Sequence, residues 1–271
     1  MPAALTLDQI VALLERRYPL ASAEPWDAVG LVCGAPSAPV RRVLWAVDPV
    51  EAVVDQAIAS DVDLIVVHHP LLLTGVHSVA ATDAKGRVIH RLISSGIALY
   101  CAHTNADVAN PGVSDALAAA LGVIDTRPLD VSGLGRIGRL SAPMLLGDFA
   151  RTVAAALPAT HHGARLLGDP GAAVSAVAVC GGSGDSLLSV ATLAGADVYV
   201  TADLKHHRAL EHREDGGCAV IDIAHWASEW PWLAQAAAVL AEDAQSQGAT
   251  VECLVSDIPT DPWTASVRSA P

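Results

Sequence analysis

Imidazole and carboxylate side chains directly follow four expected strands of this chain. An apolar run over residues 64–67 ends at His68 and His69, and the other three strand ends carry the segments AHTNAD, TADLKHH and AHWASE. These segments supply His103, Asp107, Asp203, His206, His207, His225 and Glu229. The carboxyl ends of parallel strands are where open α/β sheets bind ligands. The sequence therefore predicts a site for divalent metal ions at this edge.

The adjacent pair His68 and His69 favours two ions over one. Successive side chains of an extended chain point to opposite faces, so the two rings cannot easily bind the same ion. They can bind two neighbouring ions about 3.5–4 Å apart, as in other two-metal sites. Pro70 keeps His69 extended at the point where the strand ends.

His225 and Glu229 are four residues apart, but the sequence does not predict one helix through both. Ser228 is a good N-cap and Pro231 is best tolerated in a first helical turn. We therefore expect His225 to end a strand and Glu229 to lie in the first turn of a helix over residues 229–247.

Each of these residues also has an ordinary interpretation. A histidine at a strand end is more often a surface or hydrogen-bonded residue, and His77, His90, His161, His162 and His212 are assigned no function. Asp107 alone suits a turn, and Glu229 alone suits a first helical turn. The segment CGGSGD (180–185) fits a phosphate cradle or a tight turn equally well.

Two series of alternating strands and helices are expected, which is typical of α/β folds. The first has helices near 5–17, 50–61, 86–96 and 113–122, and strands near 40–48, 63–70 and 97–105. The second has helices near 148–157, 186–195, 205–214 and 229–247, and strands near 173–182, 196–203, 218–225 and 249–257. Residues 125–147 lack periodicity, so we expect a lobe boundary there, giving lobes over 1–128 and 129–271.

Composition narrows the function further. The chain has 271 residues and a formal net charge of −13, which disfavours binding to a nucleic-acid backbone. No apolar run is long enough to span a membrane, and no secretory signal is seen, so a cytoplasmic location is expected. The five cysteines are far apart and are expected in the core.

The order of the motifs WDAVGL (26–31), DLIVVHHPLLL (63–73), AHTNAD, GADVYVTADLKHH and AHWASEWP resembles the Nif-three-like family, whose members carry the name GTP cyclohydrolase I type 2 homologue. The resemblance spans residues 5–258. It implies a fold of two α/β lobes with a dinuclear metal site in the cleft between them. It also implies a homohexamer, and at 271 residues this chain resembles the short form without an inserted domain.

The family pattern assigns five metal ligands: His68, His69, Asp107, His225 and the bridging Glu229, with the C-terminal HxxxE segment returning to the shared site. His103 would lie beside the metals or near substrate. The chain departs from the pattern at Ala28, where WDN is common, and at Asp203, where glutamate is more usual. The function of Asp203 is left open.

Three functions fit such a site. The first is a hydrolase of a nucleotide or another anionic, phosphorylated small molecule, with two divalent ions (Zn, Mn, Fe, Co or Ni) and with His103, His206 and His207 as candidate proton carriers. The second is a metal-dependent binding or assembly ring without turnover. The third is a purely structural metal site, which would have closed coordination.

Overall fold

The computed structural model describes residues 4–267, and its contacts divide the chain into two compact units. Unit 1 combines residues 1–109 with 233–260, and unit 2 combines residues 110–232 with 261–271. The division differs from the boundary expected at 128/129. The segment that follows residue 110 contributes a helix and a strand that pack within unit 2, and residues 233–260 return to unit 1.

Unit 1 is built on a five-stranded sheet whose four neighbouring strands are parallel. Its strands, in spatial order, are β13 (Glu252–Val255), β4 (Arg42–Ala46), β5 (Leu64–Val67), β6 (Ala98–Cys101) and β2 (Gly30–Cys33). Strand β2 is antiparallel to β6, and a separate two-stranded pair joins β1 (Leu5–Thr6) to β3 (Pro39–Val40). The central strands are buried along their whole length, as expected for strands covered on both faces.

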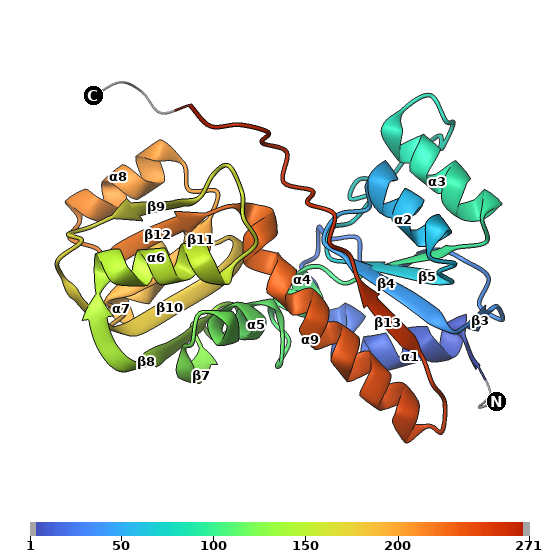
Figure 1. Cartoon of the computed structure of the whole chain (residues 1–271), viewed down its shortest axis with the longest axis horizontal. Coiled ribbons are helices and arrows are strands. Elements are labelled where there is room, and N and C mark those ends of the chain that lie inside the picture. The colour runs from blue at the N-terminus through green and yellow to red at the C-terminus, as the bar shows by residue number, and fades with distance from the viewer. Residues whose placement is uncertain (1–3, 268–271) are drawn as a thin grey trace. The chain divides into compact units, whose positions relative to one another are not determined.

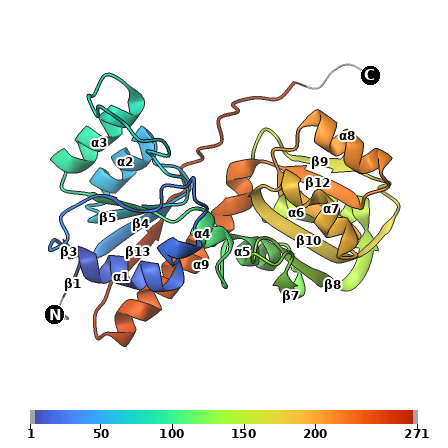
Figure 2. The same ribbon diagram turned by 180° about the vertical axis from the view of Figure 1, so that it is seen from behind.

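Helices cover both faces of this sheet, as Figures 1 and 2 show. One face carries α2 (Glu51–Ala59) and α3 (Ala84–Ser94), and the other carries α1 (Leu7–Arg17) and the later part of α9 (His225–Ser246). Smaller elements are η1 (Leu20–Ser22) and α4 (Thr104–Asp107). Aliphatic residues of α2 and α3 pack on β4, β5 and β6, which explains the apolar periodicity of both helices.

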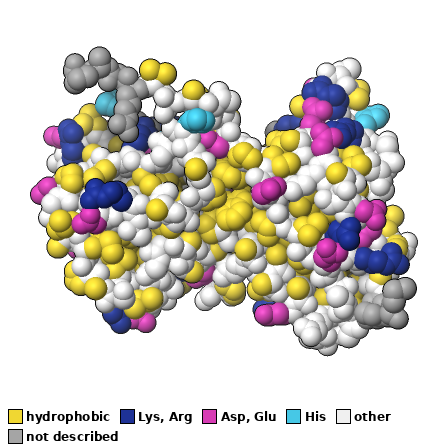
Figure 3. Space-filling view, viewed as in Figure 1, with side chains coloured by type: hydrophobic (Ala, Val, Ile, Leu, Met, Phe, Trp, Pro, Cys, Tyr) yellow, Lys and Arg dark blue, Asp and Glu magenta, His cyan; other side chains and the backbone are white. Residues whose placement is uncertain are grey.

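Helices α2 and α3 are also joined by ion pairs at the surface. Arg87 pairs with Glu51 at 2.8 Å, and Arg91 pairs with Asp55. Figure 3 shows the corresponding basic and acidic side chains next to one another over the two helices. Because these groups are exposed, the pairs contribute little to the stability of the unit.

Unit 2 is built on a mixed six-stranded sheet. Its strands, in spatial order, are β7 (Ile124–Pro128), β8 (Arg136–Leu145), β10 (Ala173–Ser183), β11 (Val198–Ala202), β12 (Ala219–Ile223) and β9 (Ala164–Leu167). Strands β10, β11 and β12 are parallel, and the others are antiparallel to their neighbours. The expectation of an irregular segment over 125–147 was wrong, because β7 and β8 form a hairpin there whose turn holds Ser132, Gly133 and Gly135.

Several helices of unit 2 pack against its sheet. They are α5 (Val113–Ala120), α6 (Leu146–Ala156), η2 (Asp185–Leu187), α7 (Leu188–Leu193), α8 (His206–Glu214) and the first part of α9. Residues of α7 join β10, β11 and β12 in one buried cluster. Within residues 4–267, no helix combines the length and apolarity needed to cross a membrane.

Helix α9 differs from its expected start. It begins at His225 and not near 229, so Pro231 lies inside it. Proline has no backbone N–H and disrupts the ladder at one position without ending a helix that is held by its surroundings. Ser228, expected as the N-cap, is an internal residue whose hydroxyl donates to the carbonyl oxygen of His225 at 2.6 Å.

Candidate metal centre

His68 directly follows β5, and its ring is almost fully buried. Nδ1 lies 3.0 Å from the carbonyl oxygen of Ala102, at the end of the neighbouring strand β6. A carbonyl oxygen can only accept, so Nδ1 carries the proton. The neutral ring therefore has its lone pair on Nε2, the nitrogen that a metal would use.

His69 is held in the same manner by a carboxylate. Its Nδ1 donates to Oδ1 of Asp48 at 2.7 Å, which again leaves the lone pair of the neutral ring on Nε2. Asp48 follows β4, the strand beside β5. Sequence analysis assigned no function to Asp48, although the same strand-end argument that found His68 applies to it.

His103 completes the pattern in unit 1. Its Nδ1 donates to Oδ1 of Asp27 at 2.9 Å, and the other oxygen of Asp27 accepts from the amide of Thr104 at 3.0 Å and from the Thr104 hydroxyl. Burial would raise the pKa of Asp27, but hydrogen bonds from Thr104 and His103 outweigh it and hold that pKa below its usual value. Burial, reinforced by His68, lowers the pKa of His103, so its ring is neutral near neutral pH.

The three rings of unit 1 form one group. Their centroids lie 5.0 to 5.6 Å apart, and one ligand atom from each lies within 4.8 Å of the others. Asp107 ends α4 and places Oδ1 3.7 Å from Nε2 of His68. His68, His69, His103 and Asp107, all named from the sequence, are therefore brought together within unit 1, and the three histidines are a group that could hold a metal ion.

His225 and Glu229 form a second pair, within unit 2. Because α9 starts at His225, the two side chains share a helix face at i and i+4. Nε2 of His225 lies 2.9 Å from Oε1 of Glu229, and the Glu229 side chain is 3% exposed. A carboxylate this deeply buried needs a positive or hydrogen-bonding neighbour, which a metal would supply.

Asp203 also has a defined contact in this pair. Its Oδ2 accepts from Nδ1 of His225 at 2.7 Å, so the tautomer matches that of His68, His69 and His103. The backbone of Asp203 has φ of +56°, a conformation that aspartate tolerates better than most residues. The sequence left the function of Asp203 open, and the structure shows that its carboxylate orients the ring of His225.

Gly181 and Gly182 of CGGSGD lie against the helix turn of His225 and Glu229, and Gly184 packs instead on Tyr199 and Thr201. Residues 180–183 belong to β10, and a Cβ on Gly182 would lie 2.5 Å from Oε1 of Glu229. The amide of Gly182 donates to Ser228 Oγ at 2.7 Å. Glycine is therefore required at position 182 because Glu229 packs too closely to leave room for a side chain. Neither the phosphate-cradle nor the tight-turn interpretation predicted this contact.

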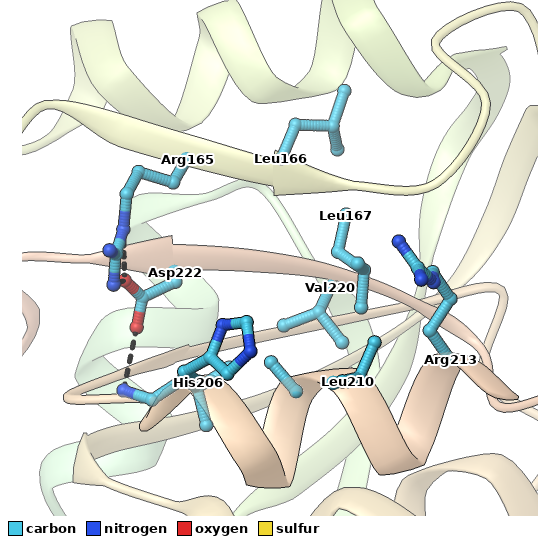
Figure 4. A pocket seen from close by; sticks show the side chains of 10 residues that line it. Arg165, Leu166, Leu167, His206, Leu210, Arg213, Val220 and Asp222 are labelled. Carbon is cyan, nitrogen blue, oxygen red and sulfur yellow. Dashed lines mark hydrogen bonds and ion pairs between the residues drawn. The ribbon is translucent and has the colours of Figure 1, made fainter. Parts of the chain in front are cut away.

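His206 and His207 lie at the start of α8, with ring centroids 5.2 Å apart. His206 lines a cavity of about 330 Å³ between α8 and β9, together with Arg165 and Asp222 (Figure 4). Arg165 donates to Asp222 at 2.8 Å, and the amide of Leu204 donates to the same carboxylate. His206 therefore faces a cavity lined by Arg165 and Asp222. The proton-carrying functions of His206 and His207 stay predictions.

Two histidines that were assigned no function present the opposite nitrogen. Nε2 of His162 lies 3.0 Å from Asp222, and Nε2 of His212 lies 2.9 Å from the carbonyl oxygen of Cys218. His212 is also buried, so burial alone does not select the nitrogen. Anchoring through Nδ1 therefore distinguishes the four strand-end histidines His68, His69, His103 and His225 from His162 and His212.

Cysteine chemistry has little support in the described chain. Burial raises the pKa of Cys33, Cys101, Cys218 and Cys253, in the last case to about 11. A thiol with such a pKa stays protonated and is a weak nucleophile. These cysteines act as packing groups, as expected.

Known proteins agree with the motif pattern. A protein from Streptomyces coelicolor named "GTP cyclohydrolase 1 type 2 homolog" is 50% identical over 98% of this chain and 96% of its own length. One of the same name from Mycobacterium tuberculosis is 37% identical over 372 aligned positions, covering 96% of this chain and 97% of its own, so it contains residues that this shorter chain lacks.

Structure and profile comparisons point the same way. A crystal structure of a Bacillus cereus protein "related to NIF3" superposes with a TM-score of 0.89 at 26% identity, covering 97% of this chain and all of that one. The family profile of Duf34/NIF3 (NGG1p interacting factor 3) matches residues 5–262. With a 50% identical relative and a profile match over nearly its whole length, this chain belongs to the Duf34/NIF3 family.

Proposed function

We propose that this protein binds two divalent metal ions through His68, His69, Asp107, His225 and Glu229 and hydrolyses a nucleotide or another phosphorylated small molecule. One observation carries the proposal. His68, His69, His103 and His225 each donate Nδ1–H to an acceptor and keep the lone pair on Nε2. Metal-binding histidines are held in this way in proteins.

The donor set fits divalent transition metals. Three imidazoles and two carboxylates suit Zn, Mn, Fe, Co or Ni, and no thiolate restricts the choice. Glu229 would bridge the ions, because its carboxylate has two oxygens and is almost fully buried. Gly182 supports this position, since any side chain there would collide with Glu229.

Bound divalent ions supply a water of lowered pKa and polarise a carbonyl, phosphoryl or purine group. His103 is placed to take a proton at Nε2, because its lowered pKa keeps the ring neutral at neutral pH. Asp27, hydrogen bonded to Nδ1, would stabilise the resulting cation. His103 is thus the proton carrier that the contacts support best.

An anionic substrate follows from the charge of the ligands. Asp107 and Glu229 bring two negative charges, against four positive charges from two divalent ions, since ligating histidines are neutral. The excess positive charge favours a phosphate or another anion. The name of the relatives, "GTP cyclohydrolase 1 type 2 homolog", makes a nucleotide the first substrate to test.

The test is metal content by plasma mass spectrometry on protein purified without chelators or a histidine tag. We expect about two ions per chain, and fewer in both His69→Ala and Glu229→Gln. His77→Ala, which removes an exposed histidine, is the matched control and should retain its metal. Loss of metal in only one of the two variants would mean that His69 and Glu229 do not bind the same ions.

Turnover separates the remaining functions. Hydrolysis of GTP or a related phosphate compound that falls in His103→Ala with metal content retained supports the hydrolase. Metal-dependent nucleotide binding without product supports a binding or assembly protein. Metal content of less than about half an ion in the wild type, not raised by added Zn or Mn, would overturn the proposal.

A further inference from the structure

The segment that follows β13 is tied to unit 1 by a series of side-chain hydrogen bonds. Ser256 donates through its hydroxyl to Gln56 at 2.6 Å, and Gln56 donates to Asp257 at 3.1 Å. Ile258 packs against the apolar cluster under α2. Residues 256–260 therefore lie along α2 and the end of β4, and carry Thr260 to a fixed position.

Thr260 ends this series at Asp48. Its hydroxyl donates to Oδ2 of Asp48, while Oδ1 of Asp48 accepts from Nδ1 of His69 at 2.7 Å. Both oxygens of one half-buried carboxylate are thus engaged, one by the C-terminal segment and one by His69. The hydrogen bond from Thr260 joins Asp48 to a residue 212 positions away in sequence.

Asp27 is held by the same kind of contact. A threonine hydroxyl, from Thr104, donates to the oxygen of Asp27 that His103 does not use. The carboxylate that orients a histidine is therefore itself oriented by a threonine at two places in unit 1. Thr104 is next to His103 in the AHTNAD motif. Thr260 is far from Asp48 in sequence and reaches it only because of the path of the chain after β13.

We propose that Thr260 is a positioning residue that acts through Asp48 to hold Nε2 of His69 in its metal-binding orientation. This inference rests on the proposed metal site. Without the Thr260 hydroxyl, the Asp48 carboxylate can rotate, and the His69 ring loses its fixed direction. Groups that orient a metal-binding histidine typically change metal affinity by roughly 10- to 100-fold when removed.

The test compares zinc affinity, by competition with a chelator, in the full-length protein and four variants. Thr260→Val removes the hydroxyl at nearly constant volume and should weaken zinc binding about 10-fold. Asp48→Asn, which removes the charge, should weaken it at least as much. Thr260→Ser restores the donor and should restore the affinity.

Asp257→Asn is the control for the segment itself, because Asp257 accepts from Gln56 and contacts neither Asp48 nor a histidine within residues 4–267. A merely structural function of the segment would lower the melting temperature of Thr260→Val and Asp257→Asn alike and leave zinc affinity unchanged in both. That result would overturn the inference. A wild type that binds no zinc would instead overturn the proposed function, so the two failures are distinguishable.

Discussion

The four histidines of the candidate metal centre share one feature, which is the ring nitrogen that carries the proton. Neutral imidazole exists as two tautomers, and an acceptor fixed at Nδ1 selects the one with its lone pair on Nε2. Carboxylates do this at His69, His103 and His225, and a backbone carbonyl does it at His68. In each ring Nε2 is therefore the nitrogen that a metal would use.

Asp203 allows the contact with His225 to be separated from backbone conformation. In Asp203→Gly the positive φ becomes favourable, which offsets the added freedom of the unfolded chain, so the free energy of unfolding should change by less than about 1 kcal/mol. The His225 ring, however, loses its anchor, and metal affinity should fall about 10-fold. Chelator competition and urea unfolding measure the two effects.

The control is Asp61→Gly, since Asp61 has a similar φ of +52° in an exposed turn after α2. It should show the same small change in stability with metal affinity unaltered. If Asp203→Gly also kept its full affinity, the hydrogen bond to His225 would have no function in metal binding.

Residue types and strand-end positions were sufficient to predict that His68, His69, His103 and Asp107 lie near one another, because the carboxyl ends of parallel strands meet at one edge. Their metal binding stays a prediction. The same argument could have found Asp48, which follows β4. No sequence signal marks Thr260, because its contact depends on where the chain runs after β13. Gly182 was noticed as a glycine, but its contact with Glu229 depends on the packing of α9 on β10.

At the scale of elements, one buried ion pair fastens α5 to the β7–β8 hairpin. Arg136 donates twice to Asp115, at 2.6 Å each, and also to the carbonyl oxygens of Gly133 and Gly135. The Arg136 side chain is 2% exposed. These four hydrogen bonds satisfy the donors of the Arg136 guanidinium. Burying this charged group without them would cost free energy.

Arg136→Met should therefore destabilise unit 2 by about 3–5 kcal/mol, because it leaves the carboxylate of Asp115 without its guanidinium. Arg139, on the same strand β8, is more than half exposed in its pair with Asp125, so Arg139→Met should cost less than about 1 kcal/mol. Urea unfolding of both variants decides the matter. Equal losses would mean that burial of the pair is unimportant.

Asp222 joins β12 to β9 and should make unit 2 sensitive to acid. Burial would raise its pKa, but hydrogen bonds from His162, the Leu204 amide and Arg165 outweigh burial and lower the pKa. The stabilisation is thus complete above the unfolded pKa of about 3.9 and disappears as the pH falls through the lower folded value. Near neutral pH, Asp222→Asn should have a lower free energy of unfolding than the wild type, and below about pH 4 it should lose less stability as the pH falls. Urea unfolding at several pH values measures both effects. A constant difference in unfolding free energy between the two proteins at every pH would contradict the prediction.

Sequence periodicity predicted most helices and the parallel strands, since their burial repeats are strong. It missed β7, β8 and β9, which are partly exposed or contain Gly and Pro, and so lack the apolar run of a buried strand. It also shortened α9 at Pro231, because local preference cannot show that packing holds a helix through a proline.

At the scale of the whole molecule, unit 2 is inserted into unit 1. The chain leaves unit 1 after Ala109 and returns at Leu233, within α9. Strand β13, which follows the return, pairs with β4 through the register of Glu252 with Arg42. Unit 1 therefore contains sheet partners about 210 residues apart, while unit 2 obtains its six strands from one continuous stretch.

A fragment of residues 110–232 should consequently fold alone, because it contains the whole mixed sheet and its buried cluster. A fragment of residues 1–109 should not, because it lacks β13 and the part of α9 that covers its sheet. Circular dichroism during heating should show a cooperative transition for the first fragment and none for the second. The reverse result would show that the insertion depends on its host.

The same arrangement sets an order for folding during synthesis on the ribosome. When the polymerised chain reaches about residue 232, every strand of the inserted unit has been made, whereas β4 must wait for the last strand of its sheet to leave the exit tunnel. Until then β4 has an open edge able to pair with other nascent chains. Chaperones that bind emerging strands would therefore be expected to act longest on the first 109 residues, and a pause in translation before residue 252 would prolong the exposure.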